Sequence, residues 1–196
     1  MSQTIAAIST PPAPAGLGVI RLSGDEAVAV ASRVFRPGRA GRDLAGLKGY
    51  TAAYGHVFDE EGDIDDCVAL VFRAPHSYTG EDVVELSCHG GLFLSRQVLR
   101  LCFAAGAEPA QPGEFTKRAF LAGKLSLTQA ESVMDLISAK NDFAVKSSLM
   151  QLRGDLKNQI IDMREQILYN VAFIESALDD PEHYSVDGFS DELKDQ

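Results

Sequence analysis

The chain has 196 residues, with 18 Lys and Arg against 28 Asp and Glu, which gives a net charge of −10 at pH 7. Hydrophobic residues make up 45% and charged residues 23%, as in ordinary globular proteins, so the composition excludes a largely disordered chain. The excess of acids does not favour a broad phosphate-binding surface and leaves room only for a local basic patch.

Cysteine use and the N-terminal composition favour a cytoplasmic protein. Cys67, Cys88 and Cys102 are odd in number and contain no Cys-x-x-Cys pair, which argues against a disulfide framework or a structural zinc site. The first twenty residues have no Lys or Arg, so the basic region of a signal peptide is missing. The apolar stretch from Ile5 to Ile20 contains prolines and is too short for a bilayer. We therefore expect a cytoplasmic location, no bound metal and no membrane contact.

Short apolar runs that alternate with two amphipathic segments characterise the first 125 residues. The runs predict strands at Thr4–Ser9, Gly18–Leu22, Tyr50–Phe58, Cys67–Phe72 and Val83–Cys88. Helical periodicity predicts helices over Asp25–Phe35 and from about Leu92 to Ala105. Because the early strands are arranged like hairpins, we predict an α+β fold with a mixed sheet rather than a purely parallel one.

An acidic segment, DEEGDIDD at Asp59–Asp66, lies between two predicted strands. Six acids in eight residues raise the question of a calcium loop. The Asp-x-Asp-x-Asp-Gly spacing with a distal Glu is missing, however. The segment is therefore interpreted as the solvated tip of a hairpin.

Almost uninterrupted helix-forming sequence follows residue 125. Ser126 and Gln129 have the spacing of a capping box. After a break near residues 140–142, apolar residues recur from Val145 to Leu178 with an average step of about 3.7, which is typical of a straight α-helix. This pattern predicts one helix about 50 Å long. We expect another chain, or polypeptide outside this sequence, to cover its apolar stripe, because the residues after Leu178 are few and acidic.

Three charged residues are candidates for a binding site. Arg21 and Glu85 each lie between two apolar residues of a predicted strand. Both fit ordinary outward-facing positions; alternatively, an inward-facing carboxylate needs a donor-rich ligand or a basic partner to offset its desolvation. Lys124 shortly precedes the predicted helix start at Ser126, where a cation is unfavourable, and one interpretation is that it faces an anion.

Other candidate motifs carry less weight. Cys88 and His89 resemble a nucleophile dyad, but neighbouring residues of an extended chain point to opposite faces, so His89 is interpreted as shaping the start of the next helix. Gly90 and Gly91 precede that helix and are a weak signal for an anion cradle. The motifs GxxxxGK[ST], GxSxG, HExxH and GxGxxG are missing from the sequence. We therefore predict no catalytic residue in this segment.

Three segments together resemble a known family. They read ISTPPAPAGLGVIRLSG, SYTGEDVVELSCHGG and PGEFTKRAFLAGKLSLTQAE, followed by DLISAK. In this order they resemble the MnmE/TrmE family of tRNA-modification GTPases, over essentially the whole chain. The resemblance implies an α/β folate-binding and dimerisation domain of the aminomethyltransferase type at 1–124 and the first part of a helical domain at 125–180. It further implies an acidic linker at 181–196 that leads to a Ras-like G domain missing from this sequence.

The same resemblance implies a function. Family members bind 5-formyl- or 5,10-methylene-tetrahydrofolate, and Arg21, Glu85 and Lys124 are the positions here that match the folate contacts. Glu85 would accept hydrogen bonds from the pterin 2-amino group and ring N–H, while Arg21 and Lys124 would face polar or anionic parts of the folate. The implied assembly is a homodimer that works with a flavoprotein of the MnmG/GidA type to modify the wobble uridine of tRNA. GTP, Mg²⁺ and K⁺ belong to the missing G domain, so this segment is not expected to act as a GTP hydrolase.

Two alternatives remain open at this stage. The first is a free-standing folate-dependent aminomethyl or formyl transferase, against which the length and the continuation into a long helix argue. The second is a helical dimerisation module without a ligand, in which Arg21, Glu85 and Lys124 are surface residues.

Overall fold

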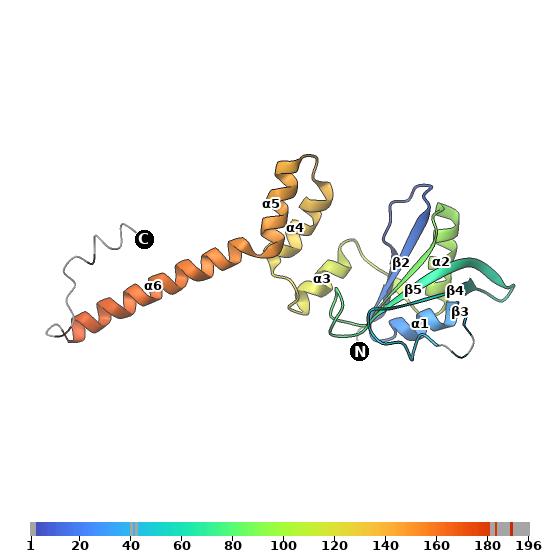
Figure 1. The fold of residues 1–196 in the computed structure, drawn as a ribbon, viewed down its shortest axis with the longest axis horizontal. Coiled ribbons are helices and arrows are strands. Elements are labelled where there is room, and N and C mark those ends of the chain that lie inside the picture. The colour runs from blue at the N-terminus through green and yellow to red at the C-terminus, as the bar shows by residue number, and fades with distance from the viewer. Residues whose placement is uncertain (1–2, 40, 42, 181–182, 184–188, 190–196) are drawn as a thin grey trace. The chain divides into compact units, whose positions relative to one another are not determined.

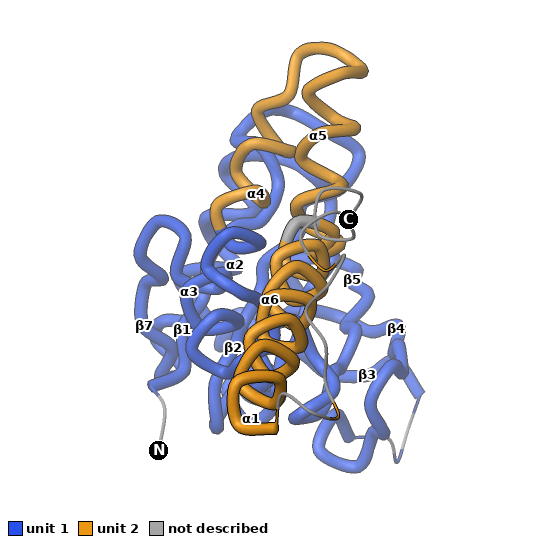
Figure 2. The backbone as a smooth tube through the Cα atoms, turned by 90° about the vertical axis from the view of Figure 1, so that its left-hand side faces the viewer, with its two compact units in different colours: residues 1–130 blue, residues 131–196 orange. Residues whose placement is uncertain are grey.

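The computed structural model describes residues 3–39, 41, 43–180, 183 and 189. The chain divides into two compact units, residues 1–130 and 131–196 (Figure 2). Among the described residues, no helix combines the length and the apolar character that a membrane crossing requires. The predicted acidic linker at 181–196 lies outside the described residues apart from His183 and Phe189.

The first unit is built on a mixed seven-stranded sheet with the order β3-β4-β5-β6-β2-β1-β7; Figure 1 shows this sheet with α1 and α2. Neighbouring strands are antiparallel, apart from β1 and β7, which run parallel. The strands are β1 (Ile5–Ile8), β2 (Leu17–Ser23), β3 (Phe35–Pro37), β4 (Thr51–Phe58), β5 (Asp63–Phe72), β6 (Val83–His89) and β7 (Glu108–Pro109). The sheet domain with a helical region after it confirms the predicted fold class.

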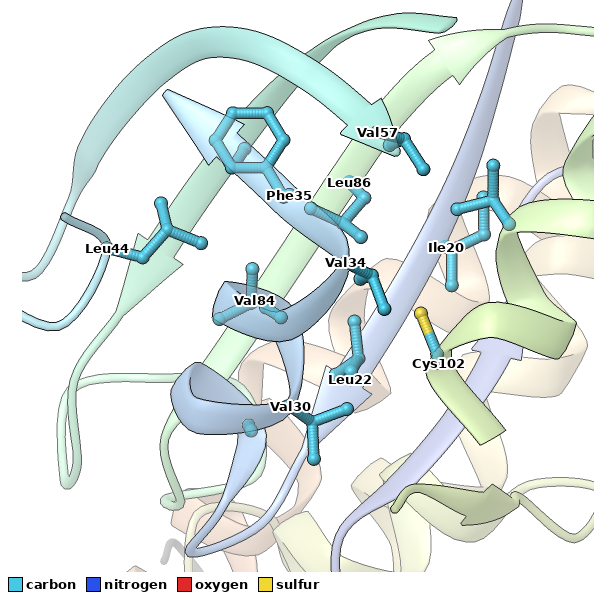
Figure 3. Packing of buried hydrophobic residues seen from close by; sticks show 14 of the residues in the cluster. Ile20, Leu22, Val30, Val34, Phe35, Leu44, Val57, Val84, Leu86 and Cys102 are labelled. Atoms are coloured by element: carbon cyan, nitrogen blue, oxygen red, sulfur yellow. The ribbon is translucent and has the colours of Figure 1, made fainter. Parts of the chain in front are cut away.

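Two helices, α1 (Ala27–Val34) and α2 (Leu92–Ala104), pack against each other and against the sheet. Alternate residues of the strands point toward them, so that Leu22 of β2 and Leu86 of β6 are fully buried against α1 residues such as Val30 (Figure 3). Side chains alternate between the two faces of a strand. Arg21, next to Leu22, and Glu85, next to Leu86, are therefore expected to face the other side of the sheet.

The three cysteines belong to this core and are free thiols. Cys88 and Cys102 are each about 1% exposed or less. Burial raises the pKa of the Cys102 thiol to about 12 and also raises the pKa of Cys67 and Cys88. The thiols therefore stay protonated at neutral pH and act as small apolar residues.

The helix predicted over Asp25–Phe35 is shorter in the structure. It begins at Ala27 and ends at Val34, and the chain continues directly into the edge strand β3. Phe35 fits the helical repeat, but Pro37 restricts the residue before it to extended backbone. Phe35 is 2% exposed, so its ring reaches the core from a strand instead of a helix.

The acidic segment is only partly a hairpin tip. Its turn is closed by Asp59, whose N–H donates to the Gly62 carbonyl at 2.9 Å, while β5 already begins at Asp63. Asp66 accepts hydrogen bonds from Tyr54 at 2.9 Å and from His56 at 2.8 Å. Asp66, which the sequence pattern assigned to the hairpin tip, thus lies in a strand and is hydrogen-bonded by donors of the neighbouring strand.

The first unit ends with α3 (Glu114–Leu121) and the start of α4 (Leu127–Ser138), which continues into the second unit. The predicted capping box is confirmed. The Ser126 N–H donates to Gln129 Oε1 at 2.8 Å, and the Gln129 N–H donates to Ser126 Oγ at 3.3 Å. The reciprocal bonds satisfy two N–H groups that a helix start otherwise leaves without partners.

The single long helix predicted over Val145–Leu178 is wrong, because the second unit contains two helices there. They are α5 (Asp142–Arg153) and α6 (Asp155–Asp179). Gly154 separates them with a left-handed φ of 84° and donates its N–H to the carbonyls of Met150 and Gln151. Apolar spacing does not reveal this break, since the repeat continues across it. Many apolar residues of α6 are exposed, including Met163 at 62% and Leu178 at 76%.

Candidate ligand-binding site

The register of β2 and β6 places Arg21 directly opposite Glu85. Arg21 donates to Glu85 Oε1 twice, from Nε at 2.8 Å and from Nη2 at 2.7 Å. The side chains are 29% and 21% exposed, respectively. The two side chains are therefore partly exposed on the sheet face opposite the core, and the Glu85 carboxylate has a basic partner there.

Both bonds from Arg21 end on the same carboxylate oxygen. Among the described residues, the other oxygen of Glu85, Oε2, accepts no hydrogen bond, and the side chain is partly open to solvent. An ionised carboxylate accepts on both oxygens. Glu85 is therefore held in place through one oxygen, while the second has no hydrogen-bond donor among the described residues.

Two aromatic rings flank the guanidinium of Arg21. Its central carbon lies 5.8 Å from the ring centroid of Tyr78 and 5.6 Å from that of Phe115. These distances fit cation–π contacts. Tyr78 comes from the loop between β5 and β6, and Phe115 from α3, so three separate segments meet at the ion pair.

The loop that carries Tyr78, residues 73–82, is braced at both ends. Arg73 Nη1 donates to Asp82 Oδ2 at 2.7 Å and closes its base. Ser23 of β2 donates to Glu81 Oε2 at 2.6 Å and shares a hydrogen bond of 2.7 Å with Thr79. Ser23 and Thr79 are fully buried, so the loop is anchored to the strand that carries Arg21.

Further contacts join the loop to α3 and to the residues that follow it. The Tyr78 hydroxyl and Thr116 Oγ1 are 2.9 Å apart. Lys124 Nζ donates to the Pro75 carbonyl at 2.9 Å, and Arg118 of α3 bonds to Glu81. The aromatic side chains are thus held by a connected framework rather than by free loops.

The structure treats the three predicted site residues differently. Arg21 and Glu85 form one ion pair, whereas Lys124 lies on another segment, is exposed, and contacts the start of the same loop. Sequence reasoning missed Tyr78 and Phe115 as individual residues. A loop has no periodicity that marks an inward-facing side chain. The only indication in the sequence was that these residues lie inside the SYTGED and PGEF segments.

The neighbouring motif around His89 makes no site with Cys88. Cys88 is buried and directs its thiol to the Gly18 carbonyl at 3.4 Å, while His89 is 72% exposed and pairs with Asp65 at 2.7 Å. The hydrogen bond that the His89 ring donates to the Asp65 carboxylate raises the pKa of His89. The Gly90 N–H donates to the Gly16 carbonyl at 3.4 Å, so this amide is not free for an anion.

Comparison with known proteins agrees with this architecture. The N-terminal domain of the GTP-binding protein TrmE matches residues 4–124, and the MnmE helical domain matches residues 127–196. The chain is therefore a protein with a mixed-sheet domain, which carries an ion pair on the face opposite α1 and α2, followed by a helical domain. The chain belongs to the TrmE/MnmE family, which confirms the resemblance seen in the sequence.

Curated relatives named tRNA modification GTPase MnmE match almost the whole chain. The protein of Lachnoclostridium phytofermentans is 46% identical over 194 residues, which are 99% of this chain and 42% of the relative. That of Symbiobacterium thermophilum is 51% identical over 92% of this chain and 39% of its own length. That of Enterococcus faecalis is 47% identical over 97% and 41%, respectively. The chain thus spans about two fifths of the length of these relatives.

Proposed function

We propose that this chain is the folate-binding and dimerisation part of a tRNA modification GTPase. In this proposal it binds a one-carbon tetrahydrofolate, the 5-formyl or the 5,10-methylene form, at the Arg21–Glu85 pair. It forms a homodimer in the cytoplasm and serves the modification of the tRNA wobble uridine. The name shared by the relatives supports the tRNA and GTPase parts of the proposal.

The single observation that carries the folate proposal is the Glu85 oxygen that has no donor among the described residues, on an ion pair whose Arg21 lies against two aromatic rings. A pterin presents its 2-amino group and an adjacent ring N–H along one edge, and a carboxylate complements these donors. Its flat ring system also matches a wall formed by Tyr78 and Phe115. Arg21 then orients Glu85 and offsets its charge, so that the carboxylate remains an acceptor in a partly desolvated place.

Lys124 is proposed to serve the other end of the folate. Its ammonium carries three donors, of which one is directed to the Pro75 carbonyl. The remaining donors are exposed beside the loop that carries Tyr78. They suit the carboxylates of the folate glutamate tail, which extend away from the pterin.

The remaining parts of the function belong to the assembled protein. GTP hydrolysis, with Mg²⁺ and K⁺, is proposed to reside in a G domain within the portion of the relatives that this chain does not span. The partner that acts with it on tRNA is proposed to be a flavoprotein of the MnmG/GidA type. For this segment alone, we expect no GTP hydrolysis.

Isothermal titration with 5-formyltetrahydrofolate tests the site. Glu85→Gln keeps the shape of the side chain but removes its charge and one acceptor oxygen, and we expect affinity to fall at least tenfold, about 1.4 kcal/mol. Asp63→Asn is a matched control, because Asp63 pairs with Arg36 at 2.6 Å in an exposed ion pair on other strands. Equal binding by wild type and Glu85→Gln, or no binding by folded wild type, would refute the site. Light scattering tests the dimer separately.

A further inference from the structure

A second guanidinium of the first unit bridges the loop and the helix that carry the two aromatic rings. Arg118 of α3 is only 14% exposed. Its Nη1 lies 3.0 Å from Glu81 Oε2, and its Nη2 lies 2.9 Å from Glu114 Oε1. Nη1 also donates to the Gln3 carbonyl at 2.8 Å. One side chain therefore joins the 73–82 loop, the start of α3 and the N-terminal segment.

This bridge belongs to a longer chain of hydrogen bonds. Ser23 of β2 donates to the same Glu81 oxygen at 2.6 Å, and Glu114 accepts the N–H of Gln111 at 2.7 Å. The hydrogen bond from Gln111, followed by the interaction with Arg118, lowers the pKa of Glu114, and the Glu81 carboxylate lies on the same guanidinium. Truncating the buried cation leaves two carboxylates close together without compensation.

The position of this bridge matters for the proposed site. Glu114 directly precedes Phe115, and Glu81 follows Tyr78 by three residues on the same short loop. The two rings flank Arg21 from opposite segments, as described above. Whatever fixes the loop against α3 therefore fixes the separation between the rings.

We propose that Arg118 is a positioning residue of the ligand site, which sets Tyr78 and Phe115 around the Arg21–Glu85 pair without touching the ligand. The proposal rests on the proposed folate function for its ligand, while its geometric part stands on the contacts alone. A planar guanidinium can serve two carboxylates at once. A lysine ammonium lacks the planar fork that spans Glu81 and Glu114, so Arg118→Lys should retain only part of the function.

The geometric part is tested first, without ligand. The chain contains no Trp, so Phe115→Trp introduces a single fluorescent reporter at the ring position. Adding Arg118→Met should shift the emission to the red and increase quenching by acrylamide. Arg36→Met is the matched control, because Arg36 pairs with Asp63 and lies 5.3 Å from the Phe58 ring centroid, on strands β3 to β5. We expect no change of the reporter with this control, and an unchanged reporter in folded Arg118→Met overturns the proposal.

The ligand part uses titration with 5-formyltetrahydrofolate in the chain without the reporter. Each side chain that must be immobilised on binding weakens affinity by about two- to tenfold, so two loosened rings predict about a tenfold loss for Arg118→Met. Arg118→Lys should fall between this variant and wild type, and Arg36→Met should bind as wild type does. A folded Arg118→Met variant with wild-type affinity contradicts the positioning role.

Two further outcomes are separated by design. If Arg118→Met fails to fold, the Glu114→Gln variant is used instead, because it weakens one arm of the bridge and leaves Arg118 paired with Glu81. This variant should shift the reporter emission and weaken folate binding. If it changes neither, the proposal is overturned. If wild type binds no folate, the proposed function fails, and a reporter that still responds to Arg118→Met upholds the positioning of the rings. Circular dichroism establishes folding in every case.

Discussion

Replacing Gly55 in the middle of β4 by alanine is predicted to destabilise the fold, although an isolated strand tolerates alanine. It lies opposite Pro37 of the edge strand β3. A Cβ atom on Gly55 would lie 2.7 Å from Cζ of Phe35 and 2.8 Å from Cα of Pro37. The Pro37 backbone cannot rotate away as a side-chain end does, and the Phe35 ring is itself 2% exposed, so β3 has to move.

The magnitude follows from two opposing effects. Overpacking of a filled interior costs about 1–3 kcal/mol, while replacing glycine by alanine restricts the unfolded chain and returns about 0.4–1 kcal/mol. Gly55→Ala should therefore lower the free energy of unfolding by about 1–2 kcal/mol. Gly38→Ala, just past β3, is the control, because its Cβ would meet Tyr54 Cδ1 at an ordinary 3.5 Å; it should be neutral or slightly stabilising.

Urea titration followed by circular dichroism measures both variants. The reasoning requires a lower midpoint for Gly55→Ala than for Gly38→Ala at a similar slope. Equal midpoints would mean that β3 does not pack closely against Gly55, which would contradict the pairing of Pro37 with Gly55.

Two other predictions concern the helical break and the exposed histidine. Gly154→Ala forces an L-residue into the left-handed conformation, which costs about 1–2 kcal/mol. The variant should therefore melt at a lower temperature when its helices are followed by far-ultraviolet circular dichroism. A stronger helical signal with an unchanged melting temperature would indicate that α5 and α6 form one continuous helix. The pKa of His89 is raised, mainly by the hydrogen bond that its ring donates to Asp65. This pair therefore stabilises the fold below about pH 6.5, and the effect disappears as pH rises through the raised pKa. Titration followed by NMR should show a lower His89 pKa in Asp65→Asn, and an unchanged value would exclude Asp65 as the cause.

The sequence predicts those features of the fold that depend on residues close together in the chain. Alternation of apolar residues located the main strands and also identified Arg21 and Glu85 as interruptions. The bond between these two residues depends on the register of β2 against β6, which joins segments 64 residues apart and has no local signature. The two-residue strand β7 is defined only by its parallel partner β1, so it lies beyond any pattern within its own segment.

Local patterns were also misleading where one residue overrides a long repeat. The apolar steps from Val145 to Leu178 continue through Gly154, yet the left-handed backbone at that glycine ends α5. The aromatic wall was missed for the opposite reason. Tyr78 and Phe115 occupy a loop and a short helix, and their places depend on tertiary contacts such as those of Thr116 with Tyr78 and of Arg118 with Glu81.

The Arg21–Glu85 pair is better explained by binding than by stability. Ion pairs near the surface contribute about 0–1 kcal/mol, and these side chains are 29% and 21% exposed. Two β-branched residues facing each other across the strands would stabilise the sheet by a similar or larger amount. A pair kept for stability would also gain from bonds to both carboxylate oxygens, as in a bidentate arrangement. Here both donors of Arg21 converge on Oε1, and among the described residues Oε2 of Glu85 has no donor, which is the arrangement that the proposed ligand site requires.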